Sequence, residues 1–340
     1  MRSSFCGLLF FLALSPVMSA WSQSVNPPAV PNGGDFSNNV TSGSKVPTGV
    51  ILVKGAWSSA SDSTTPVPEG GTVANGAFTD PYFGISYTLP PDWTEKYKGP
   101  PPSETGRYVL AQIGPSETSK GSSRGLILIT AQDMFFNPLP ASNAVELVNY
   151  SKNHLQADYK VELPPSQTTV AGRPFTFFAY WSPIAELHWY VLTTEARCHA
   201  LQIIMSSQDT KLLEKLVLDL NRMKLPEDAD PKTGAGGGNF PACVKDYAND
   251  ENLVTRVEPI FRERHFNSVP VRIIIDEEGR VKHIHFLSAF PDQSKAITDA
   301  LKQWRFKPYL RNGKPMEVET GIMFGRPPFP VRRSSEAATE

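Results

Sequence analysis

A short run of residues that has almost nothing to bury divides this chain. Residues 227–239 read EDADPKTGAGGGN, which is acidic at its start and rich in glycine at its end. Such a composition is typical of a linker. Since the chain has 340 residues, and an ordinary domain has roughly 150, we expect one folded domain on each side of the linker. The patterns described below place these domains at 76–226 and 240–327.

The N-terminal residues 1–22, MRSSFCGLLFFLALSPVMSAWS, have the form of a signal peptide. Arg2 precedes a continuous apolar run over 5–14, and the small residues Ala20 and Ser22 stand where a peptidase would recognise them. A helix over 5–20 would rise about 24 Å, which is less than a hydrocarbon core of about 30 Å. We therefore expect cleavage after Ser22 and a periplasmic or secreted protein. The alternative, an uncleaved membrane anchor, stays open.

Composition excludes a nucleic-acid partner and predicts irregular ends. The 33 Lys and Arg residues balance 34 Asp and Glu residues, so the net charge of −1 provides no basic surface for phosphates. Residues 23–75 are rich in Ser, Thr, Gly, Asn and Pro, and we expect a flexible segment in which the apolar run at 50–53 is a candidate edge strand. We also expect the tail at 328–340 to be disordered.

The segment 76–226 has an α+β pattern. Six stretches rich in β-branched and aromatic residues predict strands at 82–90, 107–114, 125–130, 174–181, 188–194 and 198–205. Asn143 and Glu146 form a capping box before one helix, and Asp209 precedes a second helix with a stripe of leucines. This order favours an antiparallel sheet covered by helices. With its opening FTDPYFGISYTLPPDW, the segment resembles the PsbP-like family of small secreted domains.

The segment 259–327 predicts a smaller β-β-α-β domain. Two apolar runs in VPVRIIIDEEGRVKHIHFLSA flank a turn in which Gly279 supplies a left-handed conformation. The next helix carries Ile297, Ala300, Leu301 and Trp304 on one face. We expect Asp292 to be its N-cap.

The chain after this helix is expected to turn once and end in a strand. Pro308 forbids further helix, and the Asn312–Gly313 pair is a strong hairpin signal. Val318, Ile322 and Phe324 then alternate with more polar residues. This alternation predicts a half-buried strand whose polar side faces water.

The sequences DEEGRVKHIHFLSA and ALKQWRFKPYLRNGKPMEVETGIMF together resemble the TonB C-terminal domain. The resemblance implies a domain in which Trp304 anchors the helix and the turn delivers the last strand to a sheet edge. Six residues are assigned structural roles on this basis: Trp304, Phe306, Pro308, Tyr309, Asn312 and Gly313.

In the TonB family this domain lies in the periplasm and binds receptor segments by strand addition. The resemblance therefore implies an envelope partner, such as a segment of an outer-membrane receptor, and eight candidate partner-binding residues: Met316, Glu317, Val318, Glu319, Thr320, Gly321, Ile322 and Met323. A homodimer through the same edge is an alternative. If residues 1–22 remain as an anchor, the alternative function is energy transduction to outer-membrane transport.

The sequence offers no positive signal for catalysis, a cofactor or a metal. GSSRG at 121–125 fits the G-x-S-x-G pattern around Ser123, but a strand follows it instead of preceding it. A secreted hydrolase is kept only as a second alternative. His283 and His285 share one strand face, yet two imidazoles alone do not make a metal site.

Two cysteines remain after removal of the signal peptide, Cys198 and Cys243. An exported protein permits a disulfide between them. The alternative is that both are small buried hydrophobic residues.

Overall fold

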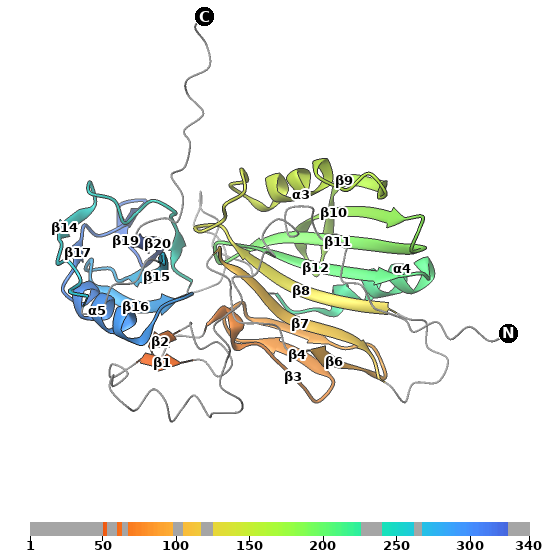
Figure 1. The fold of residues 1–340 in the computed structure, drawn as a ribbon, viewed down its shortest axis with the longest axis horizontal. Coiled ribbons are helices and arrows are strands. Elements are labelled where there is room, and N and C mark those ends of the chain that lie inside the picture. Colours follow the sequence, from red (N-terminus) through yellow and green to blue (C-terminus); the bar gives the residue numbers. More distant parts are fainter. Residues whose placement is uncertain are drawn as a thin grey trace, which may run out of the picture.

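The computed structural model describes residues 50–52, 60–62, 67–97, 105–116, 125–225, 240–261 and 267–325. Within them the chain forms two domains that lie against each other (Figure 1). The α+β class with two domains is confirmed. Four features of the sequence lie outside the described residues: the segment 1–22, Ser123, the linker at 227–239 and the tail at 328–340.

The first domain is built on an antiparallel seven-stranded sheet. In spatial order its strands are β6 (Trp93–Tyr97), β7 (Arg107–Pro115), β8 (Gly125–Asp133), β12 (His199–Ser207), β11 (Leu187–Ala196), β10 (Arg173–Ser182) and β9 (Lys160–Val170). Apart from β6 and β9, these strands are those that the β-branched and aromatic runs predicted. The long edge strand β9 contains Pro164 and Pro165, which discourage pairing with another chain.

Both faces of this sheet are covered. Helix α3 (Ala144–Asn153) lies over one face, where Tyr180 and Trp189 stack with ring centroids 5.2 Å apart. Helix α4 (Thr210–Asp219), the 3₁₀ turn η2 (Leu220–Arg222) and a small three-stranded sheet cover the other face. The small sheet consists of β3 (Thr72–Ala74), β4 (Ala77–Asp80) and β5 (Ile85–Thr88).

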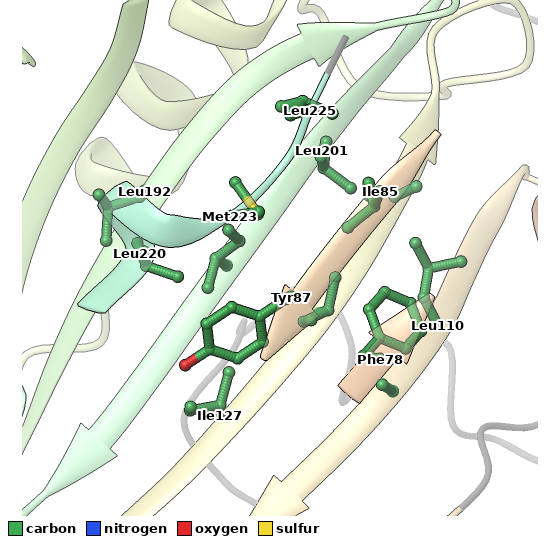
Figure 2. Packing of buried hydrophobic residues seen from close by; sticks show 14 of the residues in the cluster. Phe78, Ile85, Tyr87, Leu110, Ile127, Leu192, Leu201, Leu220, Met223 and Leu225 are labelled. Carbon is green, nitrogen blue, oxygen red and sulfur yellow. The ribbon is translucent and has the colours of Figure 1, made fainter. Parts of the chain in front are cut away.

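The main core lies between the small sheet, α4 and the large sheet (Figure 2). The leucine stripe predicted after Asp209 is buried there, and the Asp209 carboxylate accepts the backbone N–H groups of Lys211 and Leu212. The predicted cap of α3 is also present, because Asn143 Oδ1 accepts the Glu146 N–H at 2.9 Å.

The folded part of the first domain begins before residue 76. The 3₁₀ turn η1 (Pro68–Gly70) and strand β3 fall in the segment that the sequence predicts to be flexible. Pro68 is buried and Val73 packs against the main core. A stretch poor in apolar residues is thus ordered where a larger core is available to it.

The second domain is a six-stranded sheet with one helix on one face. In spatial order its strands are β1 (Val50–Leu52), β2 (Ala60–Asp62), β16 (Val281–Phe286), β15 (Val269–Ile275), β20 (Val318–Phe324) and β13 (Ala242–Cys243). Helix α5 (Pro291–Leu301) follows β16. Two short pairs, β14 (Leu253–Thr255) with β17 (Arg305–Phe306) and β18 (Leu310–Arg311) with β19 (Lys314–Pro315), complete it.

The predicted hairpin and turn are both present in this domain. Gly279 closes the β15–β16 hairpin with φ of +81°, and a Cβ there would lie 2.0 Å from the Phe306 carbonyl oxygen, so only glycine fits. Asn312 and Gly313 both have positive φ, 52° and 76°, as a two-residue turn between β18 and β19 requires.

Trp304 anchors the helix as the sequence predicts. Its side chain is buried against Phe306 and Phe324, and its indole N–H donates to the Val257 carbonyl at 2.7 Å. Pro308 is exposed and Tyr309 is half-buried, where it packs edge-on against Tyr247.

Two local predictions for this domain are wrong. Helix α5 begins at Pro291 with Phe290 as its N-cap, so Asp292 lies within the first turn. Proline is favoured as the first helical residue because its missing N–H needs no partner there. The polar side of β20 does not face water either, since Glu319 is only 4% exposed.

We expect Trp304→Ala to lower the free energy of unfolding by about 3–5 kcal/mol, as truncation of a large buried aromatic does. The indole fills the space between α5 and the end of β20, and Val257 would lose its donor as well. Urea denaturation measures the loss. Trp304→Phe, which keeps an aromatic ring, should cost less, and a loss below about 1 kcal/mol for the alanine variant would contradict this role.

Candidate functional site

The face of the second sheet opposite α5 packs against the first domain. Arg272, at the centre of β15, projects from this face and is 2% exposed. Its guanidinium lies 4.6 Å from the centroid of the Phe135 ring, just after β8. On the neighbouring strand, a Cβ at Gly321 would lie 2.8 Å from Phe135 Cβ. Glycine therefore lets the two domains approach closely at this point.

Arg272 joins two acids from the two domains. Its Nη1 donates to Asp133 Oδ2 at 2.5 Å, and its Nε donates to Glu319 Oε1 at 3.2 Å. The Tyr82 hydroxyl donates to the same Glu319 oxygen at 3.1 Å, and Arg197 Nη2 lies 3.5 Å from Glu319 Oε2. Two cations thus balance two anions in a site that excludes water, which is the arrangement that a buried charge needs.

Burial and pairing act against each other on the pKa values of the two acids. Burial raises the pKa of Asp133, and the Arg272 guanidinium offsets only part of that rise. Burial also opposes ionisation of Glu319, but Arg272, Arg197 and the Tyr82 hydroxyl hold its pKa below the ordinary value. His199 stacks edge-on against Tyr82, and burial lowers its pKa well below the usual range. The histidine is therefore neutral.

A second cluster of acids lies at the same interface. Asp80 Oδ1 accepts the backbone N–H groups of Tyr82 and Phe83, yet burial raises its pKa to about 7, with nearby Glu69 adding to the rise. Glu69 Oε1 in turn lies 3.2 Å from Nε2 of His285 on β16. His283 and His285 share a face as predicted, but among the described residues no group of three metal-ligating side chains occurs.

Cys198 and Cys243 form a disulfide between the domains, with their Cα atoms 5.6 Å apart. Cys198 belongs to the two-residue turn between β11 and β12, where Arg197 and Cys198 both have positive φ, 45° and 62°. Cys243 lies in β13, directly opposite Glu319 in register. One turn of the first domain therefore holds two adjacent strands of the second, through a covalent bond and an ion pair.

Only some of the eight candidate partner-binding residues lie on a free edge. Strand β20 lies between β15 and β13, and β13 pairs in parallel with Val318 and Glu319. Val318, Glu319 and Thr320 are buried, and Met316, Glu317, Gly321 and Ile322 are half-buried. Met323 is 46% exposed. In the described part of the chain, no strand pairs with the outer side of Gly321–Phe324.

The opposite edge of the second sheet is also partly covered. Strand β2 pairs with His285 and Phe286 at the end of β16, and β1 pairs with β2. The chain thus adds its own short strands to both sides of the core β16–β15–β20. Such coverage is a common protection against association through sheet edges.

The interface could not be predicted from patterns within either domain alone, although one residue signals it. Arg272 stands within the apolar run VPVRIII, and a charged residue there is buried only with a partner. That position was a usable signal for a buried ion pair. Nothing comparable marks Asp133, which is the last residue of its strand and follows the polar Gln132.

Comparison with known proteins supports the resemblance of the C-terminal segment. The family model of the Gram-negative bacterial TonB protein C-terminal matches residues 262–325. No curated protein matches the chain. None of the helices in the described part combines the length and apolar character needed to span a bilayer.

Two solved structures are similar to part of the chain. LpqN of Mycobacterium tuberculosis, involved in cell envelope biogenesis, is 11% identical, with a TM-score of 0.29 over 42% of this chain and 82% of its own. The cyanobacterial PsbP (CyanoP) of Synechocystis sp. PCC 6803 is 12% identical, with a TM-score of 0.30 over 46% of this chain and 96% of its own. At these TM-scores the likeness is loose.

We expect Arg272→Met to lower stability by about 3–5 kcal/mol at neutral pH, because Asp133 and Glu319 would lose their shared cation. Without it the folded-state pKa of Glu319 rises above its unfolded value and the already raised pKa of Asp133 rises further, so the loss should shrink as pH falls towards 4. Arg280→Met is the matched control, since Arg280 bonds Asp276 and Glu278 at the surface and its loss should have little effect on stability. Equal losses for the two variants in urea denaturation would contradict the buried network.

We expect Asp80→Asn to change how stability depends on pH. The folded-state pKa of Asp80, about 7, lies above its unfolded value of 3.8, so the folded protein binds more protons between these values. Stability contributed by this group therefore falls as pH rises from 4 to 7. The asparagine keeps Oδ1 for the Tyr82 and Phe83 N–H groups and cannot ionise. Thermal unfolding across this range should show a flatter profile for the variant, and an unchanged slope would contradict the raised pKa.

Proposed function

We propose that this chain is a cell-envelope protein that binds an extended segment of a partner at the outer edge of β20. The match to the TonB C-terminal family over residues 262–325 supports a TonB-like envelope protein. Strand addition is the binding mode that the resemblance implies. On this proposal the protein is exported, and the partner is another envelope protein, such as an outer-membrane receptor with an extended segment.

The observation that carries the proposal is β13. This strand shows that the outer edge of β20 accepts an added strand, because Ala242 N–H donates to Glu317 O at 2.8 Å and Val244 N–H donates to Glu319 O at 3.1 Å. Backbone groups of alternate residues point to the same side of a strand. The groups of Gly321 and Met323 therefore point outward along the same edge, beyond the end of β13.

The ladder on the other side of β20 agrees with this assignment. Leu287 N–H donates to Pro270 O across β15 and β16, so the even-numbered residues of β15 bond to β16 and the odd-numbered ones bond to β20. Residue 273 pairs with Thr320 and residue 271 pairs with Ile322. Thr320 and Ile322 thus bond inward, which leaves Gly321 and Met323 for a partner.

The first domain contributes to this site by holding the edge of β20 in a fixed position. Arg272, Glu319 and Gly321 bind the inner face of the sheet to β8 and its loop. A partner strand would therefore meet a rigid edge, which lowers the entropy cost of binding. Loops around Phe135 and Phe136 lie beside the open stretch and would contact the side chains of an added strand.

We expect Met323→Pro to abolish binding of the envelope partner while the protein stays folded. Proline removes the outward N–H of residue 323 and blocks pairing on that side, but it leaves the inward groups of Ile322 and Phe324 intact. Partner binding would be measured with an envelope protein first captured by crosslinking from an extract and then purified. Thermal unfolding of the same variants reports the fold.

Met323→Ala is the matched control, since it shortens the side chain and keeps the N–H. It should bind within a few-fold of the wild type. Thr320→Pro is unsuitable for this test, because Thr320 bonds β15 and its Oγ1 donates to Lys245 O, so its loss would unfold the sheet. Full binding by a folded Met323→Pro protein would remove strand addition at this edge.

A further inference from the structure

The outer edge of β20 is covered by the chain itself, and the covering strand carries an accessible disulfide. Strand β13 pairs with the backbone of Val318 and Glu319, so only the last part of β20 has an unpaired outer edge among the described residues. Cys243 of β13 is exposed and Cys198 is half-buried. A thiol from solution can therefore reach this bond.

We propose that the Cys198–Cys243 disulfide is a redox latch that keeps β13 on β20, and that its reduction extends the open edge back from Gly321 to Glu317. This inference rests on the proposed function, since it names the regulation of the same edge. The reductant is a dithiol, either small or carried by a protein with a C-x-x-C site.

The chemistry is an ordinary exchange of thiol and disulfide. A thiolate of the reductant attacks the exposed Cys243 sulfur, the bond to Cys198 breaks, and Cys198 leaves as a thiolate that takes up a proton. The second thiol of the reductant then attacks the mixed disulfide and releases Cys243. Two electrons and two protons pass to the protein, and the reductant becomes a disulfide.

Few other contacts hold β13 in place. It pairs over two residues in the parallel arrangement, which is the less stable one. No strand pairs with the far side of β13 among the described residues. Besides the disulfide, the described contacts of residues 240–244 are the short ladder to residues 317–319, the buried Ala242 methyl group, the Val244 side chain on the edge of the core and the Phe240 ring beside Arg197.

The chain just after β13 has stronger anchors, so opening would end there. Thr320 Oγ1 donates to Lys245 O at 3.0 Å. Tyr247 is buried, and its hydroxyl donates to the Lys307 carbonyl. Residues 240–244 are therefore the part that the latch controls, with Lys245 as the hinge.

The geometry of the turn explains why the covalent bond matters. Arg197 forms an ion pair with Glu319 of β20, and Cys198 forms the disulfide with Cys243 of β13. A single turn therefore fixes the two strands side by side. Reduction removes only the second of these ties. The ion pair and the Arg272 network stay, which means that β20 keeps its position while β13 is freed.

Hydrogen exchange of the full chain tests the latch without any partner. After reduction with dithiothreitol, confirmed complete by thiol titration, the amides of Ala242 and Val244 should exchange at least tenfold faster, and those of β15 should stay unchanged. Cys198→Ser should show the same pattern without reductant and no further change with it. Unchanged exchange at 240–244 would overturn the latch, and so would equal acceleration in β15, which signals general loosening.

A peptide probe tests whether the freed edge accepts a strand. The probe is a fluorescein-labelled copy of residues 239–246 with serine in place of the cysteine, NFPASVKD, which can take the position of β13. We expect its affinity for the reduced protein to be at least fivefold higher than for the oxidised protein, and equal affinities would overturn the proposal.

The outcomes separate this inference from the function it rests on. If partner binding needs the Met323 N–H but is equal in oxidised and reduced protein, strand addition stands and the latch fails. If reduction opens 240–244 but Met323→Pro binds the partner normally, the latch stands and strand addition at this edge fails.

Discussion

The buried guanidinium of Arg272 imposes the constraint on which the contact between the domains depends. An ion in a water-free interface is tolerated only with close counter-charges and hydrogen bonds. Here the counter-charges come from different parts of the chain, Asp133 from the first domain and Glu319 from the neighbouring strand. Neither domain alone can satisfy Arg272. The charge therefore specifies the relative position of the domains more strictly than an apolar contact of the same size.

The same network explains a departure from what the family resemblance implies. In a TonB-like domain the last strand is a sheet edge, but here β20 has β13 on its outer side and the first domain against its polar face. The sheet of the second domain is thus covered on three sides. Helix α5 lies on one face, the first domain on the other, and β13 along one edge. A binding function for such a domain depends on the short stretch of edge that remains and on whatever can lengthen it.

Much of the local structure could be predicted from the sequence. Periodicity located α4 and α5, and turn chemistry located Gly279 and the Asn312–Gly313 turn, because these signals depend on residues close together in the chain. The alternation in β20 predicted the right strand but gave its polar side the wrong environment. The two-residue period of a strand shows which side chains share a face. It does not show whether that face meets water or another domain.

The site itself could be predicted only in part. The two-domain α+β class could be predicted from the sequence, and the two cysteines were recognised as a candidate pair. Their bond, and the contacts of Asp133 and Arg197, depend on the docking of the whole first domain against β15 and β20. No local signal encodes a contact between residues 139 apart, such as Asp133 with Arg272.

That separation along the chain has a consequence for biogenesis. The Tyr82 hydroxyl donates to Glu319, which lies 237 residues further along the chain, and a chain is synthesised from its N-terminus. The first domain can complete its sheet before the second domain has been made. Until then Asp133 and Arg197 on its docking face are open to water. The last strand must then arrive to neutralise them, so a chain truncated before β20 leaves a finished first domain with an incomplete charged surface. Such a fragment would differ from the whole protein in the exposed charge on this face.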